Sequence, residues 1–132
     1  MPKILESATV LLVRDVHASA DYFRDCCGFK YDRFWGEPPG FCMVWRDGFC
    51  LMLKQTDQHD KIVPNGEVEE ALWDAYFWVD DADALYEAFK AAGAKMGYGP
   101  CDQPHGCREF SLLDLDGHEI AFGQDLQAAA EG

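Results

Sequence analysis

Alternating aromatic and acidic side chains are the residues of this sequence whose types and spacing could do chemistry. In the segment "DAYFWVD", alternate positions are occupied by Asp74, Tyr76 and Trp78. Successive residues of a β-strand point to opposite faces of a sheet, so a strand here would place one carboxylate and two rings on the same face. That combination favours binding of a flat aromatic or cationic ligand. Packing against another sheet or against a second copy of the chain would also account for the rings.

Two further segments extend this aromatic face. Both "VWRDGFCLMLKQ" and "LLDLDGHEIAFGQ" place Asp-Gly between apolar runs, which is typical of a β-hairpin. The aliphatic face of each hairpin is predicted to pack on a helix through these residues: Phe49, Leu51 and Leu53, then Ile120 and Phe122. If each Asp-Gly forms a two-residue turn, the opposite face receives these residues: Phe41, Met43 and Trp45 in the first hairpin, and Phe110 and Leu112 in the second.

Nucleophilic and metal-binding side chains are present but show no functional spacing. The six cysteines are Cys26, Cys27, Cys42, Cys50, Cys101 and Cys107, and they form no CxxC motif. The four histidines are His17, His59, His105 and His118, and none belongs to an HExxH motif. A nucleophilic thiol needs a base at a defined distance. We therefore predict reduced thiols and no catalytic residue.

These side chains must be positioned by a pattern that occurs twice. The stretch "VRDVHASADYFRDCCGF" resembles "VDDADALYEAFKAAGA", with Asp15 matching Asp81 and Gly28 matching Gly93. Each copy predicts a strand, an amphipathic helix and three more strands. The first copy is expected at 7–14, 18–27, 30–36, 40–46 and 49–55. The second copy is expected at 74–80, 83–92, 94–99, 107–114 and 118–123.

The chain has the length of one domain. Its 132 residues are enough to bury a core, and no flexible linker interrupts them. We expect a single α+β domain over 1–132, built from tandem βαβββ modules. Module one covers about 7–55, a polar connecting loop covers about 56–72, and module two covers about 73–124.

Charge and hydropathy restrict the partners. Eleven basic and 24 acidic residues give a net charge of −13, which disfavours nucleic acid and anionic membranes and tolerates a cationic ligand. The apolar run before Arg14 is too short for a signal sequence or a membrane span. We expect a cytoplasmic protein with no nucleic-acid and no membrane partner.

The whole pattern resembles a known superfamily. The paired modules, the segments "VRDV" and "VDDADAL", and above all "DQPHGCREFSLLDLDGHEIAFG" are similar to the glyoxalase, bleomycin-resistance and extradiol-dioxygenase (vicinal oxygen chelate) superfamily. The long run resembles its bleomycin-resistance-like branch. This resemblance implies the glyoxalase/bleomycin resistance fold, in which the modules form a U-shaped mixed sheet around a ligand site, and a homodimer.

The resemblance also defines where metal ligands would lie. The positions that carry them in metalloenzymes of the superfamily are here Ala8, Met52, Asp74 and Ala121. Three of these side chains cannot bind a divalent ion, which needs at least three nitrogen or oxygen ligands. We therefore predict no metal and no cofactor.

Bleomycin-resistance proteins sequester their ligand, and the resemblance implies the same role here. The hypothesis is a non-enzymatic protein that captures a cationic or aromatic small molecule on an aromatic concave surface, with a bleomycin-like molecule as one candidate. The expected ligand-binding residues are Phe34, Trp35, Phe41, Trp45, Tyr76, Trp78, His105, Phe110 and Asp74. His105 replaces the tryptophan that the family often has, and a charged imidazole would repel a cation, which favours a ligand other than bleomycin.

Two alternatives stay open. One is a lyase, isomerase or dioxygenase of the same superfamily, with a displaced metal site or with none, in which Asp74 acts as general base. The other is a structural or interaction domain whose concave surface is filled by its own side chains.

Overall fold

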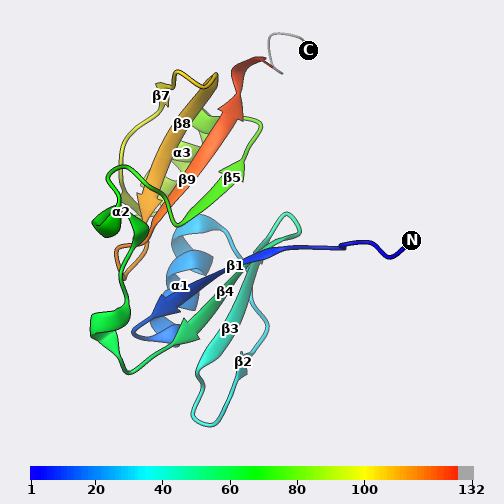
Figure 1. Ribbon diagram of the computed structural model, residues 1–132, viewed down its shortest axis with the longest axis vertical. Helices are drawn as coiled ribbons and strands as arrows, with labels where there is room; N and C mark the ends of the chain where they lie inside the picture. Colours follow the sequence, from blue (N-terminus) through cyan, green and yellow to red (C-terminus); the bar gives the residue numbers. More distant parts are fainter. Residues whose placement is uncertain (128–132) are drawn as a thin grey trace. The chain divides into compact units, whose positions relative to one another are not determined.

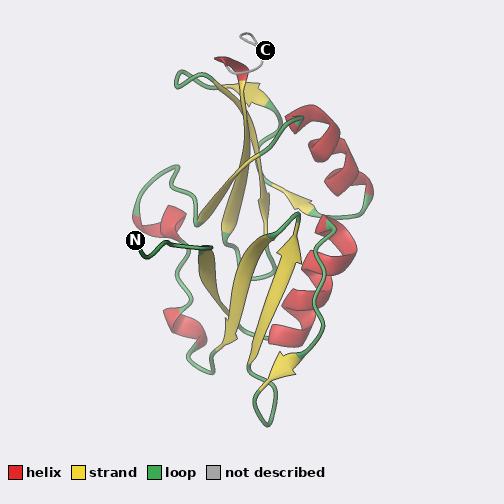
Figure 2. Cartoon of the chain, turned by 90° about the vertical axis from the view of Figure 1, so that its right-hand side faces the viewer, coloured by secondary structure: helices red, strands yellow, loops and turns green. Residues whose placement is uncertain are grey.

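The computed structural model describes residues 1–127 and contains two compact units. The first unit comprises Met1–Ile62 and the second begins at Val63. In each unit a helix lies against one face of a mixed β-sheet and leaves the other face open (Figures 1 and 2). We call the side of each sheet that is turned away from its helix the open face.

The first unit follows the expected order of elements. It contains β1 (Ala8–Val13), α1 (Val16–Cys27), β2 (Phe34–Trp35), β3 (Phe41–Arg46), β4 (Phe49–Gln55) and the 3₁₀ turn η1 (His59–Lys61). The strand order is β1-β4-β3-β2, with β1 parallel to β4 and the other pairs antiparallel. Its core lies between α1 and the sheet and includes Leu11, Val13, Phe23, Val44, Leu51 and Leu53.

The second unit repeats this arrangement with one more strand. It contains α2 (Asn65–Val68), β5 (Ala75–Trp78), α3 (Ala82–Ala91), β6 (Lys95–Met96), β7 (Cys101–Asp102), β8 (Cys107–Leu113) and β9 (Glu119–Asp125). The strand order is β5-β9-β8-β6, β7 also pairs with β8, and β5 is parallel to β9. Phe89 of α3 packs on Phe110 and Phe122 in the core of this unit.

The same local interactions begin both long helices, which confirms the sequence repeat. The side chains of Asp15 and Asp81 each accept a hydrogen bond of 3.0 Å from the backbone three residues later, as a helix N-cap does. The side-chain oxygens of Gln55 and Gln124 accept from the first N–H of α1 and of α3, each at 2.9 Å. Gly28 ends α1 with φ of 72°, a conformation that glycine adopts without strain.

The two Asp-Gly hairpins differ, and this corrects the sequence-based expectation. Arg46 pairs with Phe49, so the first hairpin has the expected two-residue turn. In the second hairpin Leu113 pairs with Glu119, and the loop between Asp114 and His118 contains three residues. The side chain of Asp114 accepts hydrogen bonds from the backbone N–H groups of Asp116 and His118, which stabilises the wider loop. The shift of one residue exchanges the two faces of β8.

The remaining differences concern short elements. The strands expected at 30–36 and 94–99 are reduced to two residues each, β7 is additional, and the segment between the modules contains η1 and α2. Over residues 1–127, no helix is both long enough and apolar enough to cross a membrane.

Candidate ligand-binding site

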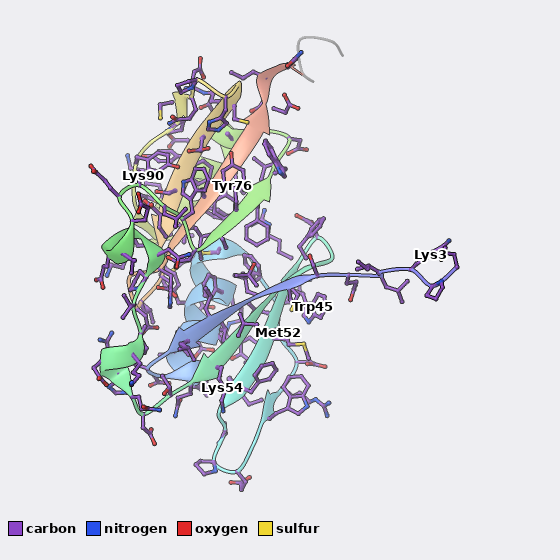
Figure 3. All side chains as sticks on the ribbon, in the orientation of Figure 1. Lys3, Trp45, Met52, Lys54, Tyr76 and Lys90 are labelled. Atoms are coloured by element: carbon purple, nitrogen blue, oxygen red, sulfur yellow. The ribbon has the colours of Figure 1, made fainter. Side chains whose placement is uncertain are left out.

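The open face of the second unit carries the aromatic side chains of β5. Tyr76 pairs with Ala121 and Trp78 with Gly123, while Phe77 stacks on Phe122 in the core. The alternation expected for this strand is therefore confirmed. Figure 3 shows Tyr76 on the side of the sheet opposite to α3. The missing side chain of Gly123 leaves room for the tyrosine, because a Cβ there would lie 2.7 Å from Cζ of Tyr76.

These rings form the wall of a pocket with a volume of about 360 Å³. Its lining residues are Trp73, Tyr76, Trp78 and His105. The ring of Tyr76 packs against Trp73 and Trp78, with centroid distances of 4.8 and 5.1 Å. Trp78 is 66% exposed, so much of its surface is accessible to a ligand. We call this hollow the aromatic pocket.

A buried carboxylate adjoins the aromatic pocket. Glu109 of β8 is only 2% exposed and lies on the open face, opposite Gly123. The hydroxyl of Tyr76 donates to its Oε1 at 2.7 Å, and the hydroxyl of Tyr98 donates to its Oε2 at 2.5 Å. Nε2 of His105 lies 3.2 Å from Oε1. The pocket thus joins an apolar wall to a negatively charged group.

The tyrosines around Glu109 act as hydrogen-bond donors. Burial and the hydrogen bond to Glu109 raise the pKa of both Tyr76 and Tyr98 well above the ordinary value. Both hydroxyls therefore stay protonated at neutral pH. Nε1 of Trp73 donates to the Tyr98 hydroxyl at 3.0 Å, which links the wall of the pocket to the same network. This network holds the rings in place before any ligand arrives.

Sequence reasoning did not identify Glu109, Tyr98 or Trp73 as part of a site. The expected two-residue turn of the second hairpin placed Glu109 on the helix side of β8. A three-residue loop reverses this assignment, and the Asp114 side chain that stabilises the loop was the available sequence signal. Trp73 lies in the loop before β5, where strand periodicity gives no orientation, and Tyr98 lies beyond β6, because the strand expected at 94–99 ends at Met96.

Two of the expected ligand-binding residues lie on the helix side of their sheets. Phe110 is fully buried and stacks on Phe122 with its ring centroid 5.1 Å away, so its expected place on the concave surface is wrong. Leu112 shares its parity and is also buried in the core. Phe34 stacks on His17 of α1 at 4.9 Å, so it too packs on the helix side.

The open face of the first unit carries the other expected rings. Met43 pairs with Met52 and Trp45 with Cys50, as the two-residue turn predicts. Trp35 packs edge-on against Phe41, with 5.7 Å between ring centroids, and Arg33 lies 4.4 Å from the centre of the Trp35 ring. Figure 3 shows Trp45, Met52 and Lys54 along this sheet, on the side away from α1.

Asp74 connects backbone segments. Its Oδ1 accepts a hydrogen bond from the backbone N–H of Asn65 at 2.8 Å, and its Oδ2 accepts from that of Glu119 at 2.9 Å. Both oxygens are thus engaged in holding the start of β9 and of α2. This geometry gives Asp74 a positioning role and lends no support to a general base.

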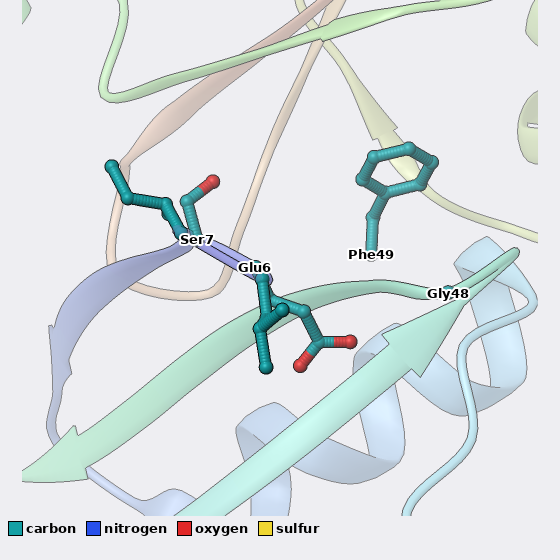
Figure 4. A pocket seen from close by; sticks show the side chains of 6 residues that line it. Glu6, Ser7, Gly48 and Phe49 are labelled. Carbon is teal, nitrogen blue, oxygen red and sulfur yellow. The ribbon is translucent and has the colours of Figure 1, made fainter. Parts of the chain in front are cut away.

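A second pocket, of about 370 Å³, lies in the first unit. Its walls come from the segment before β1 and from the β3–β4 turn, including Gly48 and Phe49 (Figure 4). Ile4 and Leu5 in this wall are 92% and 88% exposed, so few contacts hold them. The side chains of the aromatic pocket are held by hydrogen bonds, so its walls are more rigidly positioned than those of the second pocket.

The donor set of the described chain does not fit a metal centre. Over residues 1–127, no three His, Cys, Asp or Glu side chains are grouped so that they could hold a metal ion. Among the positions that the superfamily uses, Ala121 is fully buried beside Tyr76 and Met52 lies on the open face of the other unit. Glu109 and His105 supply two donors only, fewer than the three that a catalytic zinc site uses.

The thiols do not favour nucleophilic chemistry. All six cysteines are thiols, with no disulfide bond among them in residues 1–127. Burial raises the pKa of Cys42 to about 11 and also raises the pKa values of Cys50 and Cys107. A thiol is nucleophilic as the thiolate, so these three are poorly suited to attack a substrate at neutral pH.

The fold is that of a small α+β protein with two βαβββ modules, and the second unit contains the aromatic pocket. The family model of the Glyoxalase/Bleomycin resistance protein/Dioxygenase superfamily matches residues 7–122. The chain belongs to this superfamily. A search of the curated proteins gives no match.

Solved structures with the same fold include proteins that bind antibiotics. The bleomycin-binding protein of bleomycin-producing Streptomyces verticillus, in complex with copper(II)-bleomycin, is 27% identical, with a TM-score of 0.70 over 92% of this chain and 97% of that one. TnmS3, an antibiotic-binding protein from Streptomyces sp. CB03234, is 22% identical, with a TM-score of 0.71 over 95% and 98%. Lactoylglutathione lyase from Agrobacterium tumefaciens is 17% identical, with a TM-score of 0.68 over 96% and 96%. Because binding proteins and an enzyme share this fold, the function must come from the site.

Proposed function

We propose that this protein binds and sequesters an aromatic or cationic small molecule in the aromatic pocket, without altering it chemically. The observation that carries the proposal is a preformed pocket whose wall is made of three aromatic rings and whose polar side is the buried carboxylate of Glu109. Such a pocket offers stacking surfaces and a charge, which suffice for binding. The similarity to a bleomycin-binding protein supports the same role.

The size of the pocket restricts the part of the ligand that can enter. Pockets for drug-sized molecules have volumes of about 300 to 1,000 Å³. At about 360 Å³ the aromatic pocket is near the lower limit and suits a flat fused-ring group rather than a whole glycopeptide. A bleomycin-like ligand would therefore insert only its planar part. His105 at the pocket favours a different small molecule as the natural ligand.

The proposal includes a cytoplasmic homodimer. β1 is an edge strand of its sheet, and its side chains Val10 and Leu12 are 59% and 39% exposed. Apolar side chains in a row on an edge strand are costly to leave in water and favour association. We expect light scattering to give twice the mass of the chain. A mass equal to that of one chain at micromolar concentration would contradict this part of the proposal.

We expect Trp78→Ala to weaken binding of a planar aromatic ligand about tenfold. Stacking and cation–π contacts are worth about 1 to 2 kcal/mol, and 1.4 kcal/mol corresponds to tenfold. Because Trp78 is 66% exposed, its removal should leave stability unchanged. Isothermal titration calorimetry with bleomycin and with 9-aminoacridine, a planar cation at neutral pH, measures the effect.

Phe49→Ala is the matched control, because it removes an aromatic side chain that is 63% exposed in the other unit. The affinity of the Phe49→Ala variant for these two ligands should stay within twofold of that of the parent chain. Mass spectrometry of the ligand after prolonged incubation should return an unchanged mass. Equal affinities of parent and Trp78→Ala, or a ligand recovered with a new mass, would overturn the proposed function.

A further inference from the structure

Within residues 1–127, the side chains that contact Glu109 include no lysine or arginine. Two of them are the neutral hydroxyls of Tyr76 and Tyr98, which engage one oxygen each. A carboxylate offers about four acceptor positions, so each oxygen has one position besides its tyrosine bond, and at Oε1 this position is occupied by Nε2 of His105. Among the ion pairs of the described chain, the basic partner of Glu109 is His105. A carboxylate that is only 2% exposed is stabilised when a full positive charge takes such a position.

The contact with His105 is the weakest of the three and the easiest to exchange. Its length of 3.2 Å exceeds the 2.7 and 2.5 Å of the tyrosine contacts. The imidazole is 48% exposed, so solvent reaches this side of the contact and weakens it. Hydrogen bonds of 2.7 and 3.0 Å fix the backbone of Gln103 and Gly106 on either side of it. The side chain can therefore turn outward without a change of the loop.

The position that His105 would vacate lies beside the aromatic wall. His105 and Tyr76 both line the pocket, and both contact Oε1 of Glu109. A ligand whose ring stacks on Trp78 or Tyr76 can thus place an attached nitrogen near this oxygen. A cation within about 6 Å of the ring centres gains a further cation–π attraction. The aromatic wall would then bind the ring of the ligand, and Glu109 would bind its charged nitrogen.

We propose that the aromatic pocket selects planar ligands that carry a positively charged N–H group, and that this group replaces Nε2 of His105 on Oε1 of Glu109. The inference rests on the proposed function, because it names the chemical class of ligand for the same pocket. Tyr76 and Tyr98 position the carboxylate, and Trp73 positions Tyr98. His105 occupies the cation position until the ligand arrives.

The test compares two probes that share one ring system. 9-Aminoacridine is cationic at neutral pH, and acridine is neutral there. We expect calorimetry with the full chain to show that the cation binds at least tenfold more tightly than the neutral ring. Glu109→Gln should reduce this preference to twofold or less while the affinity for acridine changes by no more than twofold. His105→Ala should increase the preference, because it removes the competitor.

Glu119→Gln is the matched control for charge. Glu119 lies on the same open face and does not line the pocket. Its Oε2 accepts a hydrogen bond of 2.8 Å from the hydroxyl of Ser111. Its substitution removes the same unit of charge and should leave the preference within twofold. An equal loss of preference in both glutamine variants would show that overall charge attracts the cation, and it would overturn the role of Glu109.

The remaining outcomes separate this inference from the proposed function. If both probes bind the parent chain equally and Trp78→Ala weakens both, the inference fails and the proposed function stands. If neither probe binds the parent chain, both fail for planar ligands of this class. His105→Ala keeps the inference testable if Glu109→Gln does not fold, because an increased preference there requires that Nε2 of His105 competes with the cation for Glu109. A lower preference in His105→Ala would overturn the exchange.

Discussion

Gly123→Ala should destabilise the second unit by about 2 to 3 kcal/mol and disrupt the aromatic pocket. A Cβ at this position would lie 2.7 Å from Cζ and 3.0 Å from Cε1 of Tyr76, closer than packed atoms allow. The ring must therefore move, and its 2.7 Å hydrogen bond to Glu109 breaks. Forcing extra atoms into a packed site costs about 1 to 3 kcal/mol, and the loss of a hydrogen bond of about 1 kcal/mol places the expected effect in the upper part of that range. Urea unfolding measures the change.

The effect depends on the tyrosine, so a second substitution should reverse its sign. In a Tyr76→Ala background the clash is gone, and alanine is a better strand residue than glycine by about 0.5 to 1 kcal/mol. Gly123→Ala should then stabilise the chain slightly. Gly99→Ala is the control, because a Cβ there would meet Tyr86 at an ordinary 3.6 Å. A loss at position 123 that persists without the Tyr76 ring would contradict this account of the close approach.

The parts of the fold that repeat in the sequence could be predicted from it. The aspartates before the two helices and the glycine after the first act locally, so Asp15, Asp81 and Gly28 define the helix boundaries wherever the chain places them. The alternation on β5 is equally local, and Tyr76 and Trp78 share a face as expected. Gln55 and Gln124 complete the repeat at the strand ends, a match visible in the two hairpin segments.

The site was harder to predict, because one residue of register decides which side chains meet. Asp47-Gly48 and Asp116-Gly117 are the same dipeptide, yet only the first forms a two-residue turn. In the second hairpin the Asp114 side chain competes for backbone N–H groups and adds a residue to the loop. Phe110 consequently enters the core and Glu109 reaches the pocket. Ile120 and Phe122 of β9 lie on the helix side as predicted, so the difference from the prediction is confined to the loop and to β8.

Asp114→Ala should destabilise the second unit by about 3 to 4 kcal/mol, the largest effect that we expect from a single substitution. Asp114 is fully buried and contacts Nδ1 of His118 at 2.7 Å. Its other oxygen accepts two backbone hydrogen bonds, of 2.9 and 2.8 Å. Removal of one partner from such a buried pair costs about 3 to 5 kcal/mol, and loss of the proton from His118 limits the cost here. Urea unfolding at several pH values measures the effect.

The size of this effect should depend on pH. Burial by itself lowers the pKa of His118, but the hydrogen bond and charge of Asp114, with smaller contributions from Asp74 and Asp116, outweigh it and raise the pKa above 6.5. The folded state therefore holds the proton more tightly than the unfolded state does. The resulting stabilisation is fully present below pH 6.5 and is lost as the pH rises through the folded pKa. The difference between parent and variant should thus be larger at about pH 6 than at about pH 9.

Two further variants separate the effect of the negative charge of Asp114 from the effect of its hydrogen bonds to the backbone. Asp114→Asn retains an oxygen for the backbone N–H groups and loses only the negative charge, so its cost should be smaller and the pH dependence due to His118 should vanish. Asp80→Ala removes an exposed carboxylate of the same unit and should change stability by no more than about 0.5 kcal/mol. If Asp114→Asn kept the pH dependence of the parent, the carboxylate would not be what holds the proton on His118. The same loop sets the register of β8, so a large loss of stability in Asp114→Ala should be accompanied by loss of the Glu109 contacts and of ligand binding.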